Sequence, residues 1–164
     1  MIKTANPVKP KLSKEGMAEI DRHIAKYPDK RAALMPALKV AEREYGWVSE
    51  EAMAEIAGIL GLTKAEVYGF ATYYTMYKLQ PTGRHLIQFC DNIACMLCTA
   101  EGLLDYLHKK LGIGPGETTA DNRFSLVTMD CLGACGTAPA MLVNKDFHDN
   151  LTEKKLDEIL EKYR

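Results

Sequence analysis

The sequence predicts an α/β protein, with an N-terminal helical bundle followed by a small sheet that is covered by helices. Three observations support this class. Hydrophobic residues make up 47% of the 164 residues, which is enough for a packed core. Apolar residues recur at a helical period from Leu12 to about Tyr77. After the turn at residues 80–83 the pattern changes to short apolar or alternating runs, which are typical of strands.

The first two helices follow a short lead-in. Residues 1–11 contain two prolines and are expected to be flexible. Ser13 can cap the first helix, because its hydroxyl can accept a hydrogen bond from a backbone N–H of the first turn. Pro28 ends that helix, and Asp29 starts the second one. Pro36 lies inside the second pattern, so it either kinks the helix or moves its start to a later residue.

Two further helices complete the N-terminal part. Ser49 is expected to cap the third helix. Thr63 and Glu66 have the spacing of a capping box, which opens a fourth helix that runs to about Tyr77. We therefore expect residues 12–80 to form a helical domain.

Residues 81–164 are expected to form a second domain. The order of its elements is strand, helix, three strands and helix, which is the layout of a thioredoxin-like domain. Strands are predicted at residues 84–89, 124–129 and 140–143, with a fourth starting at Phe147; helices are predicted from about Thr99 to Leu111 and, capped by Thr152, to Tyr163.

Charge and hydropathy exclude several classes of function. The net charge is −1, whereas a nucleic-acid-binding surface usually gives a basic excess. No apolar run approaches the ~20 residues that cross a bilayer, so no direct membrane insertion is expected. The first residues lack the apolar stretch of a signal peptide. We expect a cytoplasmic protein, or one at the cytoplasmic face of a membrane, where disulfides are uncommon and cysteines more often bind metals.

Four of the five cysteines form two close pairs that are far apart in the sequence. Cys90 and Cys95 form the first pair, and Cys131 and Cys135 form the second. Each iron of a [2Fe–2S] cluster takes two protein sulfurs, and thiolates are the soft ligands that iron–sulfur chemistry selects. The small residue Gly133 leaves room for the backbone to fold over the inorganic sulfides. The pattern predicts an electron carrier with a cysteine-bound [2Fe–2S] cluster.

The two cysteine motifs resemble those of a known family. Cys-x4-Cys after the first strand and Cys-Leu-Gly-Ala-Cys-x-x-Ala-Pro after the second resemble the thioredoxin-like [2Fe–2S] ferredoxin subunit of respiratory NADH:quinone oxidoreductase (complex I). The same family supplies subunits to NAD-linked hydrogenases and formate dehydrogenases. The resemblance covers roughly residues 12–164 and includes the stretches 45–48 and 67–74. One departure is the segment 96–99, Met-Leu-Cys-Thr, where the family commonly has a glycine.

This resemblance implies the role of the chain. It implies a subunit of an NADH dehydrogenase complex that holds one [2Fe–2S] cluster on Cys90, Cys95, Cys131 and Cys135 and has no catalytic residues of its own. FMN and NADH are then expected on a flavin-binding partner subunit. The sequence itself contains no Gly-rich dinucleotide fingerprint, which agrees with this division of labour.

The fifth cysteine, Cys98, leaves two alternatives open. With Cys90 and Cys95 it gives the Cys-x4-Cys-x2-Cys spacing of plant-type ferredoxins, which would use a different set of ligands. With Cys95 alone it gives a Cys-x-x-Cys between a strand and a helix, as in thioredoxin-like disulfide oxidoreductases. The simpler expectation is that Cys98 is a small buried residue in the first turn of a helix.

The helical domain contains no candidate ligand, although it takes up nearly half of the chain. Its aromatic residues between Tyr68 and Tyr77 fall on more than one helix face. Apolar residues on two faces indicate contacts on both, one of which can be a partner protein. We expect residues 12–80 to dock on the flavin subunit; the alternative is that these helices only cover one face of the sheet.

Overall fold

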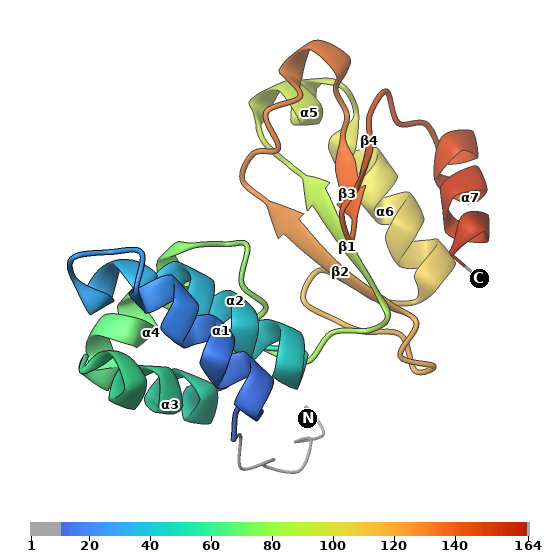
Figure 1. Cartoon of the computed structure of the whole chain (residues 1–164). Helices are drawn as coiled ribbons and strands as arrows, with labels where there is room; N and C mark the ends of the chain where they lie inside the picture. Colours follow the sequence, from blue (N-terminus) through green and yellow to red (C-terminus); the bar gives the residue numbers. More distant parts are fainter. Residues whose placement is uncertain (1–10, 164) are drawn as a thin grey trace. The chain divides into compact units, whose positions relative to one another are not determined.

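The computed structural model describes residues 11–163 (Figure 1). The expected flexible lead-in lies outside the described residues, except for Lys11. The chain divides into two compact units, residues 1–81 and 82–164, one residue away from the expected domain boundary. We describe each unit by itself, as the helical unit and the sheet unit.

The helical unit contains four α-helices and one 3-10 helix. Ser13, Ser49 and Thr63 each accept a hydrogen bond from a backbone N–H in the first turn of a helix, as predicted. The elements are α1 (Lys14–Ile24), η1 (Lys30–Ala33), α2 (Leu34–Tyr45), α3 (Glu50–Leu60) and α4 (Lys64–Tyr73).

The position of Pro36 decides where the second helix begins. Asp29 caps η1 and not a long α-helix, and α2 starts at Leu34. Pro36 therefore lies in the first turn of α2, where its missing N–H leaves no helical hydrogen bond broken. Of the two predicted outcomes, the later start is confirmed.

Helix α4 is shorter than predicted. It ends at Tyr73, because Tyr74 has an extended backbone (φ −93°, ψ 107°). Tyr77 was placed at the end of this helix by its sequence pattern, but the chain turns so that its ring enters the core with 5% exposure. The Tyr77 hydroxyl donates to the carbonyl of Met35 at 3.2 Å. Burial of this ring in the core explains why the helix stops early.

The sheet unit contains a four-stranded mixed sheet in the order β2-β1-β3-β4. Strands β1 and β2 are parallel, and the other two pairs are antiparallel. The strands are β1 (His85–Cys90), β2 (Phe124–Met129), β3 (Met141–Val143) and β4 (Asp146–His148), and the helices are α5 (Ile93–Leu97), α6 (Ala100–Leu111), η2 (Cys135–Thr137) and α7 (Glu153–Lys162).

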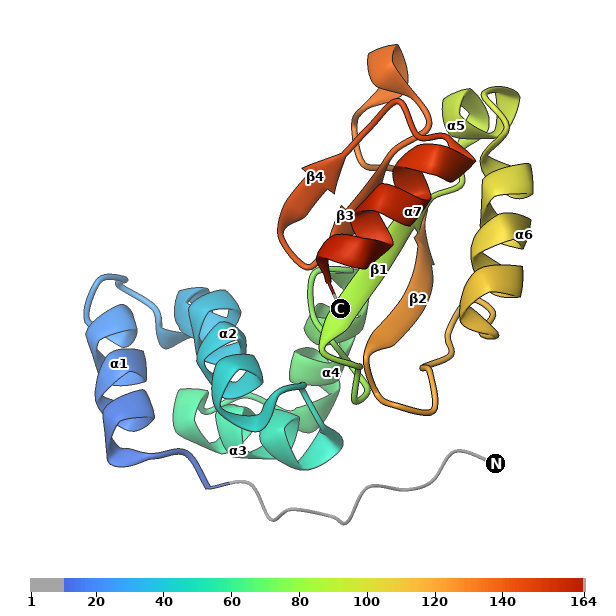
Figure 2. The same ribbon diagram turned by 90° about the vertical axis from the view of Figure 1, so that its right-hand side faces the viewer.

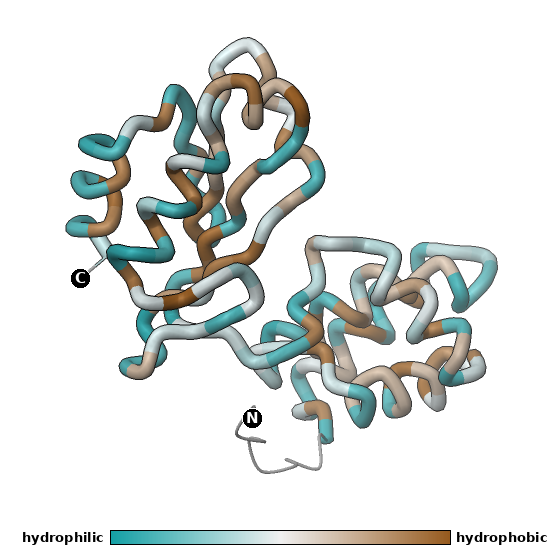
Figure 3. Tube along the Cα trace, turned by 180° about the vertical axis from the view of Figure 1, so that it is seen from behind, coloured by the Kyte–Doolittle hydropathy of each residue, from teal (hydrophilic) through white to brown (hydrophobic). Residues whose placement is uncertain are grey.

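Two helices cover one face of this sheet. Ile87 and Phe89 of β1 share that face with their register partners in β2 and β3, and all belong to one buried cluster with residues of α6 and α7. The two helices lie side by side, and the Tyr106 hydroxyl of α6 donates to Asp157 of α7 at 2.7 Å (Figures 1 and 2). Hydrophilic and hydrophobic residues alternate along both helices, as burial of one side requires (Figure 3).

Within residues 11–163, the helices are all too short or too polar to cross a membrane.

Candidate metal centre

The parallel pairing of β1 and β2 brings the two cysteine segments to one edge of the sheet. Cys90 is the last residue of β1 and lies opposite Met129, the last residue of β2. Since parallel strands end at the same edge, Cys131 follows at the edge where Cys90 lies. Helix α5 and the loop that contains η2 are both at this end of the sheet (Figure 1).

Cys95 is held by the short helix α5, which was not predicted. Asn92 begins this helix, and its side chain accepts a hydrogen bond from Ile93 N at 2.7 Å. Five residues are too few to show a helical period in the sequence, so the apolar pattern could not reveal α5. The helix turns Cys95 inward, so that Cys90 and Cys95 are each only 3% exposed.

The two buried thiols of Cys90 and Cys95 contact one another. Burial, followed by the hydrogen bond with Cys90, raises the pKa of the Cys95 thiol to about 11, while a backbone hydrogen bond with Ala140 acts in the opposite direction. Cys135 also lies close enough to influence this pKa through its charge. A thiolate at such a position is stable only beside a positive ion, which is what an iron ion supplies.

The second cysteine pair lies in a more exposed loop. Cys131 follows β2 and Cys135 begins η2, and both are exposed. Gly133 between them has φ +72°, a left-handed conformation that glycine adopts without strain. In this conformation the Gly133 N–H donates to the Cys131 sulfur at 3.3 Å. Backbone N–H groups directed at sulfur are a means by which proteins tune iron–sulfur clusters.

The thiols fit a binuclear cluster better than a single metal ion. Among the described residues, no three His, Cys, Asp or Glu side chains surround a common point as a single ion requires. A [2Fe–2S] cluster divides four thiolates between two irons, so only two of them approach each metal. The soft, all-sulfur donor set and the backbone N–H groups near it also suit this cluster.

Comparison with known proteins assigns the family. The model of the thioredoxin-like [2Fe-2S] ferredoxin family matches residues 20–164. The chain belongs to this family. The expected α/β class with a thioredoxin-like sheet domain is thereby confirmed.

Curated relatives of this ferredoxin are E-type subunits of one enzyme, NADH-quinone oxidoreductase. The relative from Rhizobium meliloti is 48% identical over 89% of this chain and 87% of its own length. The relative from Escherichia coli K12 is 40% identical over 93% of this chain and 92% of its own length. A crystal structure of an NAD+-reducing [NiFe]-hydrogenase matches with a TM-score of 0.67 at 28% identity, covering 79% of this chain. The ferredoxin spans only 22% of that hydrogenase chain.

The prediction for Cys98 was wrong. Cys98 is exposed and ends α5; it is not buried in the first turn of the next helix. The cause is Thr99, which has φ +71° and separates α5 from α6. The family's usual glycine is missing from this segment, and Thr99 adopts a conformation there that favours glycine.

The environment of Cys95 argues against both alternatives for Cys98. The groups that affect Cys95 include Cys90 and Cys135 but not Cys98, which does not favour the plant-type set of ligands. In a disulfide oxidoreductase the first cysteine of Cys-x-x-Cys is an accessible thiol with a lowered pKa. Here Cys95 is buried and its pKa is raised, which is the opposite arrangement.

Proposed function

We propose that this chain is the electron-carrying [2Fe–2S] subunit of an NADH:quinone oxidoreductase and that Cys90, Cys95, Cys131 and Cys135 are the cluster ligands. The observation that carries the proposal is the meeting of two cysteine pairs at one edge of the sheet, with Cys95 between Cys90 and Cys135. The strong similarity to subunits named for that enzyme supports the choice of complex.

In this function the chain's own residues hold and shield the electron carrier. When bound, a [2Fe–2S] cluster accepts and releases electrons, at a potential that depends on hydrogen bonds to sulfur, burial and charge. Cys90 and Cys95 exclude water from one side of the site, and the Gly133 N–H stabilises negative charge on the Cys131 sulfur. We expect the isolated chain not to oxidise NADH, because FMN and NADH bind to a partner subunit of the complex.

Serine substitutions test the ligand set. Each of Cys90→Ser, Cys95→Ser, Cys131→Ser and Cys135→Ser should disturb the cluster, because each iron needs its two thiolates. Cys98→Ser is the matched control and should keep iron and sulfide at the wild-type level. The measurements are iron and sulfide per chain and the electron paramagnetic resonance spectrum of the reduced protein. An empty site in Cys98→Ser, with full clusters in Cys131→Ser or Cys135→Ser, would contradict the assignment.

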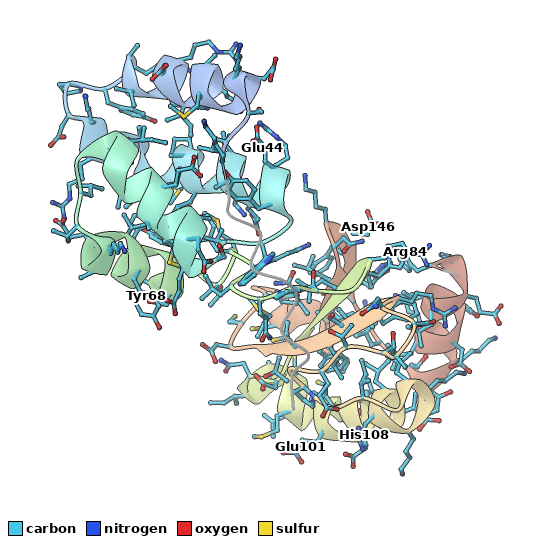
Figure 4. The ribbon with its side chains drawn as sticks, turned by 90° about the horizontal axis from the view of Figure 1, so that it is seen from below. Glu44, Tyr68, Arg84, Glu101, His108 and Asp146 are labelled. Atoms are coloured by element: carbon cyan, nitrogen blue, oxygen red, sulfur yellow. The ribbon has the colours of Figure 1, made fainter. Side chains whose placement is uncertain are left out.

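The helical unit is proposed to dock on the flavin-binding subunit. Four large apolar side chains of α4 and the following loop are exposed: Tyr68 (54%), Tyr73 (77%), Met76 (42%) and Leu79 (37%). Tyr68 extends outward from α4 (Figure 4) and lines a groove of about 660 Å³ between α3 and α4, together with Met53 and Ala65. Exposed aromatic residues beside a groove are typical of protein interfaces.

Point variants of the full chain test this docking. Tyr68→Ser and Tyr73→Ser should keep the cluster but release the flavin-binding subunit during purification from the native host. Tyr27→Ser changes another exposed tyrosine of the helical unit (43% exposed) and should keep the partner bound. Retention of the partner by Tyr68→Ser and Tyr73→Ser would mean that the helices have only a structural role.

An equivalent subunit of an NAD-linked hydrogenase is the second candidate. The structural match to the NAD+-reducing [NiFe]-hydrogenase favours it, and the family resemblance adds formate dehydrogenase. The chains that co-purify with this protein from its host distinguish these complexes. Quinone-reducing membrane subunits would support NADH:quinone oxidoreductase, in which we place this chain as a peripheral subunit at the cytoplasmic face.

A further inference from the structure

The side chain of Asn92 joins the two cysteine segments. Its Oδ1 accepts a hydrogen bond from Ile93 N at 2.7 Å, at the start of α5. Its Nδ2 donates to the backbone carbonyl of Asp130, the residue directly before Cys131. A single amide therefore contacts the backbone on both sides of the candidate cluster site.

This contact lies where the pairing of the parallel strands ends. The last backbone hydrogen bond between the two segments runs from Asp91 N to Met129 O at 3.3 Å. Within the described chain, no backbone hydrogen bond joins residues 92–98 to residues 130–138. The amide of Asn92 extends the ladder by one side-chain bond toward Cys131.

The loop that follows Asp130 has mainly local contacts of its own near its start. Gly133 N–H donates to the Cys131 sulfur, and Thr137 N–H donates to the carbonyl of Ala134 at 3.0 Å. Such contacts fix the shape of the loop but not its distance from the first cysteine pair. The amide of Asn92 supplies a link across this distance.

We propose that Asn92 is a positioning residue that sets the distance between the Cys131–Cys135 loop and the pair Cys90 and Cys95, and so the fit of the [2Fe–2S] cluster. The inference rests on the proposed function, since it takes these cysteines as ligands. Without the amide, binding of the cluster must itself order the loop, which costs conformational entropy. The cluster should then leave faster and occupy a wider range of geometries.

Two variants separate the link from the helix cap. Asn92→Asp keeps an oxygen that can accept from Ile93 N but loses the N–H donor to Asp130. Asn92→Ala loses both contacts without adding charge. Because the aspartate adds a negative charge near the site, Asn92→Asp is also combined with Asp130→Asn, which restores the net charge and leaves the Asp130 backbone carbonyl in place.

A matched control lies at the other end of β1. Asn144 Oδ1 accepts from Leu86 N at 3.0 Å, and its Nδ2 lies 3.3 Å from Nδ1 of His85. Asn144→Asp makes the same chemical change and keeps the acceptor. Aspartate also tolerates the positive φ of +58° at this position. This control should release the cluster at the wild-type rate.

The full-length chain, loaded with its cluster under anaerobic conditions, is mixed with a chelator, and the loss of visible absorbance is followed. Both Asn92 variants should release the cluster about fivefold faster than wild type, the effect expected from one lost hydrogen bond. Their reduced electron paramagnetic resonance lines should broaden, a change that a purely structural residue would not cause. The unfolding temperature of Asn92→Asp should match that of the Asn144→Asp control.

The outcomes separate the two hypotheses. If wild type holds a [2Fe–2S] cluster and the Asn92 variants, including the charge-restored one, release it at the wild-type rate with unchanged spectra, the inference is overturned and the proposed function stands. If the wild-type chain binds no iron, the proposed function itself fails. If Asn92→Ala does not fold, the two aspartate variants decide the result.

Discussion

The helical unit and the sheet unit have nearly equal lengths, but different kinds of contact define them. Three of the four α-helices in the helical unit begin at a serine or threonine whose side chain caps the first turn. In the sheet unit, α6 begins after Thr99 without any side-chain cap, and the candidate site depends on strand pairing between distant segments. The comparison teaches that the chemistry of this protein lies in the unit that local signals specify least.

The largest expected effects come from emptying the two cores. Phe89 of β1 and Leu38 of α2 are each fully buried, in separate clusters. Phe89→Ala should destabilise the sheet unit by ~3–5 kcal/mol, and Leu38→Ala should destabilise the helical unit by ~2–5 kcal/mol. Because Phe89 directly precedes Cys90, only its replacement should also weaken cluster binding.

Denaturant unfolding followed by circular dichroism and by cluster absorbance checks this pair of variants. Loss of the cluster at the same denaturant concentration in both would mean that the two cores unfold as one, against the comparison drawn above.

Changes at two helix starts should have intermediate effects of opposite sign. Thr63 caps α4 together with Glu66, so Thr63→Ala should destabilise the helical unit by ~1 kcal/mol. Thr99 holds a left-handed conformation at φ +71°, which costs a β-branched residue roughly 1–2 kcal/mol. Thr99→Gly should therefore stabilise the sheet unit, less the contribution of the Thr99 hydroxyl bond to the Cys98 carbonyl at 2.6 Å.

Thermal unfolding of the two variants measures both signs. A destabilised Thr99→Gly protein would show that the threonine hydroxyl contributes more than the backbone strain costs.

The smallest expected effect is a pH dependence confined to the sheet unit. Burial is the main cause that lowers the pKa of His148 below its ordinary value of 6.5, and the charges of Lys155 and Lys162 act in the same direction, against Asp146 and Asp149. Folding then favours the neutral ring, so the stabilising contribution is complete above about pH 6.5 and falls as the pH drops below that value.

Unfolding temperatures of wild type and His148→Gln between pH 7.5 and about pH 5 test this, because only wild type should lose this contribution. Parallel curves for the two proteins would show that His148 does not couple folding to pH.

Much of the fold was predictable because its signals are short in range. The bounds of α1 and α3 follow from their caps and terminal residues, and the strand at residues 124–129 was predicted at its observed length. Two features were missed for physical reasons. Helix α5 is too short to show a period, and α4 ends early because the ring of Tyr77 turns into the core.

By itself, the sequence determined the class of fold, the two-part organisation and the two cysteine pairs, since composition, caps and ligand spacing are local properties. Only the tertiary structure decided how the cysteines are arranged. Pairing of β1 with β2 and the turn of α5 place Cys95 beside Cys90 and near Cys135, and leave Cys98 exposed. The role of Asn92 also depends on this pairing, because its amide reaches a carbonyl that is distant in the chain and adjacent only after the parallel strands have formed.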